Sequence, residues 1–115
     1  MRSDRLVDLA QDVVIDAKGE DVRILDVRKI TDITDYMVVV TGTSNRHVIS
    51  IADKVTEKMI ERKCKPIGVE GLKIGDWVLV DFGDVVIHVM RSQVREFYSL
   101  EKLWSGGESS GAAEV

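Results

Sequence analysis

Apolar side chains recur at helical spacing in two long segments of the chain. Over residues 4–18, apolar positions separated by three, four, seven and eleven residues form one face, which predicts a first helix that stops at Gly19. A second stripe over residues 48–59 predicts a second helix, which runs to about Lys63 and cannot continue through Pro66. Each of these helices therefore has a single apolar face.

Short apolar runs between and after these helices have the length and the turn-forming boundaries of strands. Residues 37–40 are apolar without interruption, as expected for a strand that is covered on both faces. The clearest pair of strands is joined by Phe82, Gly83 and Asp84, which predicts a hairpin. A last, shorter helix is expected over residues 94–103. The expected strands are residues 22–27, 36–41, 67–69, 77–81 and 85–90.

The expected order of elements is α-β-β-α-β-β-β-α. A single α/β domain over residues 1–104 satisfies this order, with a mixed, mostly five-stranded sheet and helices packed on it. The segment 105–115 is rich in glycine and serine, so we expect it to be a disordered tail.

Both faces of the expected hairpin are apolar, which bears on function. In its first strand Trp77 and Leu79 point to one face, and Val78 and Val80 point to the other. Two long helices and one short helix are few to cover both faces of five strands, and uncovered apolar surface usually marks a partner site. We therefore expect a homodimer, a protein partner, or both. The alternative is that the third helix completes the cover.

The composition limits the kinds of site that the chain can form. It has 115 residues, a formal net charge of −4 and one cysteine, Cys64. A single cysteine excludes an intrachain disulfide, and with two histidines the chain has only three of the four Cys or His ligands of a structural zinc site. The acidic balance argues against direct, sequence-specific nucleic-acid binding. A basic cluster near the end of the second helix complements the helix dipole; it consists of Lys58, Arg62, Lys63 and Lys65.

The sequence predicts a cytoplasmic protein without membrane contact. No apolar run approaches the roughly 18 residues needed to cross a bilayer. The first five residues carry two arginines and an aspartate, and no apolar segment of a signal peptide follows them. A lone cysteine also fits a reducing compartment.

Two groups of residues are candidates for metal or phosphate binding, and turn chemistry explains both. Carboxylates in turns are candidate Mg²⁺ ligands, but aspartate is favoured there because it bonds nearby backbone N–H groups. The turn at residues 42–44 offers backbone N–H groups to a phosphate, yet it lacks the length and the lysine of a P-loop. We interpret it as a helix cap, supplied by Thr43 or Ser44. The aspartates are Asp32, Asp35, Asp81 and Asp84.

The remaining reactive side chains do not form a catalytic pattern. Nucleophilic catalysis needs a base held beside the nucleophile, and the sequence places only lysines near Cys64. His47 lies in the first turn of a helix, where we expect it to face solvent or to bond locally. His88 lies within an apolar strand, which favours a hydrogen-bonded structural role. We therefore expect no catalytic residue, no cofactor and no enzyme activity.

Trp77 is the clearest candidate for contact with a partner. It opens the hairpin, directly after Asp76 and in the same segment as Asp81 and Asp84. A tryptophan rimmed by acids is typical of a binding hot spot for a basic protein. A position in the core explains the same pattern equally well.

Several segments, in this order and spacing, resemble one known family, the ribosomal silencing factors called RsfS or Iojap. The match covers about residues 4–104. The first loop departs from the family pattern, since many relatives have glycine or serine at the positions of Lys29, Thr31 and Asp32. The segments that carry the resemblance are 33–36, 42–48, 51–53, 68–71, 77–89 and 95–104.

The resemblance implies an α/β fold similar to that of nucleotidyltransferases but without their catalytic acids. It implies binding to the large ribosomal subunit through universal large-subunit ribosomal protein fourteen, at the face that meets the small subunit. Subunits then cannot join, and translation is repressed. It also implies a homodimer when the protein is free. The implied contacts lie on the hairpin, at Trp77, Val78, Leu79, Asp81, Phe82 and Asp84, with His88, Met90, Tyr98 and Leu100 as further positions that a core role also explains.

The function that follows is steric repression, with no bond made or broken. An apolar, aromatic-centred patch docks on a basic ribosomal protein, and acids at its rim orient the contact. One alternative is a nucleotidyltransferase-like enzyme that uses Asp32, Asp35 or Asp81 with Mg²⁺ and binds a nucleotide at residues 42–44. Another alternative is a general dimeric adaptor for a different protein partner.

Overall fold

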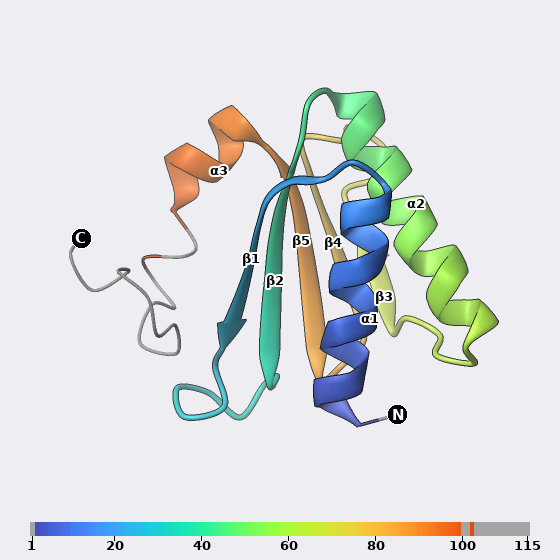
Figure 1. Cartoon of the computed structure of the whole chain (residues 1–115). Coiled ribbons are helices and arrows are strands. Elements are labelled where there is room, and N and C mark those ends of the chain that lie inside the picture. Colours follow the sequence, from blue (N-terminus) through green and yellow to red (C-terminus); the bar gives the residue numbers. More distant parts are fainter. Residues whose placement is uncertain (1, 100–101, 103–115) are drawn as a thin grey trace.

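The structure is a computed structural model that describes residues 2–99 and 102 (Figure 1). The elements follow the expected order and the five strands form one mixed sheet, so the predicted fold class is confirmed. The helices and strands are α1 (Ser3–Asp16), β1 (Glu20–Asp26), β2 (Tyr36–Gly42), α2 (Asn45–Glu61), β3 (Gly68–Glu70), β4 (Trp77–Asp81), β5 (Val85–Arg91) and α3 (Ser92–Tyr98).

The last helix differs from its predicted bounds. It begins at Ser92, directly after β5 ends at Arg91, so that no loop separates the strand from the helix. Ser99 follows α3 in the left-handed conformation, with φ at 50°, and such a residue commonly ends a helix. Residues 100, 101 and 103 of the predicted helix lie outside the described residues, as does the predicted tail 105–115.

The sheet has the strand order β1-β2-β5-β4-β3. The two central strands, β2 and β5, run parallel, and the three other pairs are antiparallel. The hairpin predicted from residues 77–90 is therefore present as β4 and β5, and its second strand lies at the centre of the sheet.

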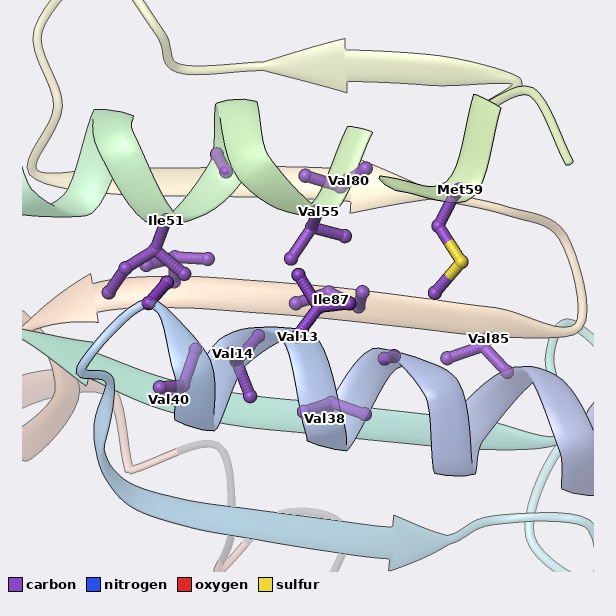
Figure 2. Packing of buried hydrophobic residues seen from close by; sticks show 14 of the residues in the cluster. Val13, Val14, Val38, Val40, Ile51, Val55, Met59, Val80, Val85 and Ile87 are labelled. Atoms are coloured by element: carbon purple, nitrogen blue, oxygen red, sulfur yellow. The ribbon is translucent and has the colours of Figure 1, made fainter. Parts of the chain in front are cut away.

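Both long helices cover the same face of the sheet. Figure 1 shows α1 and α2 side by side over this face, and their apolar stripes meet valines and an isoleucine of the central strands. Figure 2 shows this packing, in which Val14 and Val55 approach Val38, Val40 and Ile87 from the two helices. The apolar stripes predicted for both helices are thus confirmed as core surfaces.

The opposite face of the sheet has a second, smaller buried cluster. Leu25, Val27, Met37, Val39 and Met90 are buried there, and the half-buried Trp77 and Val94 pack against them. We expected uncovered apolar surface, but the centre of this face is buried. On β4, this face has two half-buried apolar side chains, Trp77 and Leu79.

The turn between β2 and α2 joins three elements. Ser44 is the N-cap of α2, where its hydroxyl accepts a hydrogen bond from the backbone N–H of His47, which confirms the predicted cap. The Nδ1 atom of His47 accepts from the backbone N–H of Thr43 at 2.9 Å, so Nε2 carries the proton and donates to the carbonyl of Ala17 at 3.0 Å. This imidazole ties the end of α1 to the start of α2.

A buried arginine, which the sequence did not single out, anchors α3 to the sheet. Arg95 is 6% exposed, and its Nη1 atom donates to the carbonyl of Asp21 at 2.6 Å and to the hydroxyl of Thr41 at 2.9 Å. Asp21 lies at an irregularity of β1 and has a φ of 48°. The side chain therefore connects α3 with both β1 and β2.

Among the described residues, no helix is long and apolar enough to cross a membrane.

The core on the helix-covered face generates a first prediction. Ile87 is fully buried on central strand β5, so Ile87→Ala is expected to lower the free energy of unfolding by about 2–5 kcal/mol through lost contacts and a cavity. Ile60→Ala, at a position on α2 that is 49% exposed, is a matched control and should change it by less than about 0.5 kcal/mol. Urea unfolding measures both values, and equal effects would contradict this assignment of the core.

Candidate partner-binding site

Trp77 lies at the start of β4, on the face of the sheet that α1 and α2 leave uncovered. Its indole Nε1–H donates a hydrogen bond to Nδ1 of His88 at 3.0 Å. Its ring lies 4.8 Å from the ring of Tyr98 on α3, between ring centroids. Trp77 is therefore packed and half-buried, and its contact with a partner stays a prediction.

His88 holds the indole of Trp77 from the neighbouring strand. In the β4–β5 register Leu79 pairs with His88 and Trp77 pairs with Met90, so Trp77 and His88 are diagonal neighbours on one face. Burial lowers the pKa of His88 to about 4. Since an indole N–H can only donate, Nδ1 of His88 must be unprotonated and the ring is neutral. His88 is thus the buried, hydrogen-bonded histidine that the sequence predicted.

An exposed aromatic pair on α3 extends the surface around Trp77. Phe97 is 80% exposed and Tyr98 is 50% exposed, and their rings meet edge to face at 5.1 Å between centroids. Tyr98 links this pair to Trp77. Large exposed aromatic side chains are enriched at protein interfaces. We call Trp77, Tyr98 and Phe97 the aromatic surface.

Phe97 was not among the residues selected from the sequence. The available signal was its position beside Tyr98 in a short helix, because two adjacent helical residues point about 100° apart and cannot both face the sheet. One of the two aromatic side chains therefore had to project from the protein. The sequence alone did not reveal which.

Of the predicted acids, Asp76 directly precedes Trp77, whereas Asp81 and Asp84 lie apart from it. Leu79 and Asp81 share the face of Trp77, but Asp81 is four residues further along β4, or about 13 Å away. The carboxylate of Asp81 accepts from the backbone N–H of Gly83 at 2.8 Å, which is the turn chemistry expected from the sequence. Asp84 is exposed, and its backbone carbonyl accepts from the N–H groups of Asp35 and Tyr36.

Four of the predicted contact residues are buried, one of which is His88, described above. Val78 is fully buried on the opposite face, against the core below α1 and α2. Phe82 belongs to the same core cluster at 8% exposure, and Met90 is fully buried in the second cluster. Their side chains are not accessible to a partner in this structure. The surface residues that remain from the prediction are Trp77, Leu79, Asp81, Asp84 and Tyr98, and Leu100 lies outside the described residues.

The candidate residues for nucleotide chemistry lie at opposite ends of the sheet. Asp35 precedes β2, whereas the turn at residues 42–44 follows it, and a strand of this length separates them by about 20 Å. A nucleotide at that turn therefore could not share a metal ion with Asp32, Asp35 or Asp81. Within residues 2–99 and 102, no three His, Cys, Asp or Glu side chains are grouped as a metal site.

The basic cluster at the end of α2 is not a purely positive surface. A groove of about 490 Å³ between α1 and α2 is lined by Lys54, Lys58 and Arg62 on one side and by Asp12 and Asp16 on the other. Lys58 also lies 3.8 Å from the carboxylate of Glu61. Acidic side chains thus face basic ones across this groove. The groove lacks the continuous positive charge that binds the phosphate backbone of a nucleic acid.

Comparison with known proteins gives consistent matches. The model of the family described as ribosomal silencing factor during starvation matches residues 1–114. Ribosomal silencing factor RsfS of Chromobacterium violaceum is 45% identical over 104 residues, which cover 90% of this chain and 85% of that protein. The Mus musculus protein named mitochondrial assembly of ribosomal large subunit protein 1 is 33% identical over 102 residues, covering 86% of this chain and 45% of that protein.

The fold also matches a solved structure. An X-ray crystal structure of a Chromobacterium violaceum protein superposes with a TM-score of 0.90 at 42% sequence identity, covering 96% of this chain and 92% of that chain. Sequence and fold therefore agree with the resemblance stated from the motifs, and this chain belongs to the ribosomal silencing factor family.

Proposed function

We propose that this protein binds the large ribosomal subunit through universal large-subunit ribosomal protein fourteen and keeps the small subunit from joining. The observation that carries the proposal is the aromatic surface, in which the half-buried Trp77 packs beside the exposed Tyr98 and Phe97, on a member of this family. The name of the Mus musculus relative, which refers to assembly of the large ribosomal subunit, supports the choice of that subunit. The proposed result is repression of translation in the cytoplasm.

The aromatic surface is suited to binding because its geometry exists before the partner arrives. Trp77 is fixed by its bond to His88 and by packing on Tyr98, so its ring loses little freedom on binding. Surfaces that are ordered in advance bind more tightly for the same contact area. Tryptophan and tyrosine are also enriched among the residues of interface hot spots.

The proposed action is steric rather than chemical. The Chromobacterium violaceum relative is named as a silencing factor. The acids and the turn that a nucleotidyltransferase-like alternative requires lie about 20 Å apart. Occupying the surface that meets the small subunit is sufficient to prevent joining, without catalysis or a cofactor. The homodimer expected for the free protein stays a prediction, which the mass of the protein in solution would test.

Sedimentation of ribosomal subunits tests the function and its central residue together. The protein should migrate with large subunits and reduce the formation of joined ribosomes. Trp77→Ala should weaken binding by about 2 kcal/mol or more, as for a central interface aromatic, so that at a protein concentration near the dissociation constant it stays at the top of the gradient. Ile15→Ala, at a 52% exposed position on α1, is the matched control and should bind as the unchanged protein does.

Far-UV circular dichroism must show that both variants are folded. Unchanged binding by folded Trp77→Ala would remove the proposed surface. A protein that stays at the top of the gradient without any mutation, and leaves subunit joining unaffected, would remove the proposed function. The adaptor alternative would then be favoured.

The acids of the hairpin should act on the rate of association. Asp84→Lys leaves the bonds of its backbone carbonyl in place, and Asp81→Asn keeps an acceptor for Gly83 while removing the charge. If these carboxylates steer a basic partner, both changes should slow association several-fold at low salt and have little effect at high salt. Stopped-flow binding to large subunits measures the association rate. Asp8→Lys, at an exposed position on α1, is the control. Equal rates for all variants would exclude steering by these acids.

The buried imidazole predicts how stability depends on pH. The pKa of His88 is about 4 in the folded protein and about 6.5 when unfolded, so the unfolded state binds more protons between these values. The contribution of His88 to the free energy of unfolding should therefore be fully present above pH 6.5. It should decrease by about 3 kcal/mol as the pH falls to 4. Urea unfolding across this range should show a smaller loss for His88→Gln. Parallel curves for the two proteins would contradict a buried neutral His88.

A further inference from the structure

The loop at residues 71–76, between β3 and β4, is tightly built. Gly71 and Gly75 have φ values of 94° and 82°, which favour glycine. A Cβ atom at Gly71 would overlap the carbonyl oxygen of Trp77, and one at Gly75 would lie 2.9 Å from the carbonyl oxygen of Asn45. The backbone N–H of Gly75 also donates to the carbonyl of Gly71 at 2.9 Å. The loop is thus pressed against the start of β4 and the start of α2.

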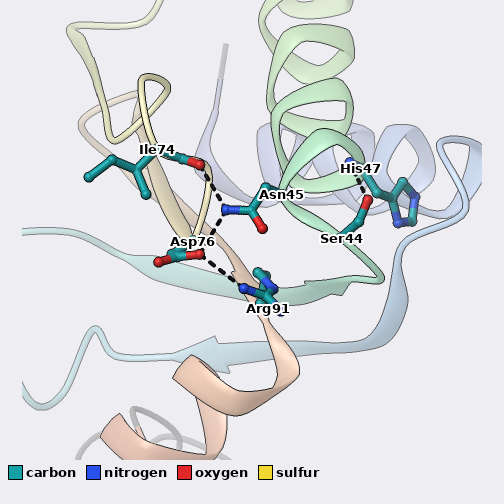
Figure 3. Close-up of polar contacts among 6 residues, drawn as sticks. All are labelled: Ser44, Asn45, His47, Ile74, Asp76 and Arg91. Carbon is teal, nitrogen blue, oxygen red and sulfur yellow. Dashed lines mark hydrogen bonds and ion pairs between the residues drawn. The ribbon is translucent and has the colours of Figure 1, made fainter.

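Asp76 connects this loop to two other elements, as Figure 3 shows. Its carboxylate oxygen Oδ1 accepts from Nδ2 of Asn45 at 2.8 Å and lies 3.3 Å from Nη1 of Arg91. Its backbone carbonyl accepts from the N–H of Arg91 at 3.0 Å. Nδ2 of Asn45 also donates to the carbonyl of Ile74 at 2.8 Å. One aspartate therefore joins the beginning of α2, the beginning of β4 and the end of β5.

These attachments lie next to the aromatic surface in the chain. Trp77 directly follows Asp76, and α3, which carries Tyr98, directly follows Arg91. The relative position of the two rings thus depends on where Asp76 holds Arg91. The start of α2 therefore has two polar functions. Ser44 caps the helix, and the next residue, Asn45, donates to the loop at Ile74.

The exposure of these side chains indicates that the bonds of Asp76 position the loop more than they stabilise the fold. The side chains of Arg91 and Asp76 are 34% and 45% exposed, and ion pairs of that kind contribute little to folding. The same bonds nevertheless restrict three chain segments to one arrangement.

We infer that Asp76, held by Asn45 and Arg91, is a positioning residue that sets the placement of Trp77 relative to Tyr98 for partner binding. The inference rests on the proposed function, because it assigns a role in the same surface. Its consequence is that removing the bonds of Asp76 weakens binding without removing any residue that contacts the partner.

Binding to purified large subunits tests this inference with the whole chain. Asn45→Ala and Asp76→Ala should each weaken binding about tenfold. The affinity of the double variant should be close to that of the single variants, because both changes break the same contact. Asp76→Asn keeps an oxygen that accepts from Asn45, so it should restore most of the affinity. Asp53→Ala, at an exposed aspartate of α2, is the matched control and should bind unchanged.

Two further readouts separate positioning from a general loss of structure. The chain has two tryptophans, so Trp104→Phe leaves Trp77 as the only one, and its fluorescence and quenching report on its contact with Tyr98. We expect Asn45→Ala and Asp76→Ala to shift this signal, while their urea midpoints change less than that of Ile87→Ala. Asn45→Ala keeps the experiment decisive if Asp76→Ala does not fold, because alanine is well tolerated in a helix.

The outcomes also distinguish the inference from the proposed function. If the unchanged protein binds and the Asp76 and Asn45 variants bind equally well, the inference fails and the function stands. If the unchanged protein does not bind large subunits, the function fails, and the fluorescence of Trp77 then decides whether Asp76 positions it. Unaltered fluorescence in both variants would overturn the inference in either case.

Discussion

The parallel pairing of β2 with β5 is the constraint on which the rest of the molecule depends. These two strands lie at the centre of the sheet, and both of their faces carry buried apolar side chains. A strand pair of this kind is stable only when each face is covered. On one face α1 and α2 supply the cover. On the other face a smaller cluster forms around Met37, Val39 and Met90, and Trp77 packs at its border.

The second face also explains how the half-buried Trp77 keeps a fixed orientation while part of its ring is accessible. Trp77 packs against the buried cluster with part of its ring, while His88 accepts the indole N–H from within the sheet. The imidazole is unprotonated because burial disfavours its charged form, and this leaves Nδ1 as an acceptor. The desolvation of one residue therefore determines the orientation of its neighbour. The orientation of Trp77 is therefore set by residues of the sheet and not by a loop.

Much of the fold was predictable from the sequence because it depends on local periodicity. The stripes of α1 and α2, the apolar run of β2 and the turn of the hairpin each specify their element within a few residues. The sequence could not show that both long helices cover one face, because periodicity identifies an apolar face but not the surface against which it packs. For the same reason it could not distinguish the half-buried Trp77 from Met90, its buried cross-strand neighbour. Contacts between distant residues, such as Asn45 with Asp76 and Arg95 with Asp21, have no local signal at all.

The direct passage from β5 into α3 has a mechanical consequence. Arg91 is both the last residue of a central strand and the N-cap of the helix, and Arg95 ties the next turn to β1 and β2. Displacing α3 therefore requires opening the end of the central strand pair, whereas a helix on a loop could swing away at little cost. Regions with many buried contacts open rarely, and on a slower timescale than surface loops. Phe97 and Tyr98 thus project into solvent from a helix that is attached directly to the core. A partner docked on the proposed surface would therefore be held by a rigid support, which would favour slow release.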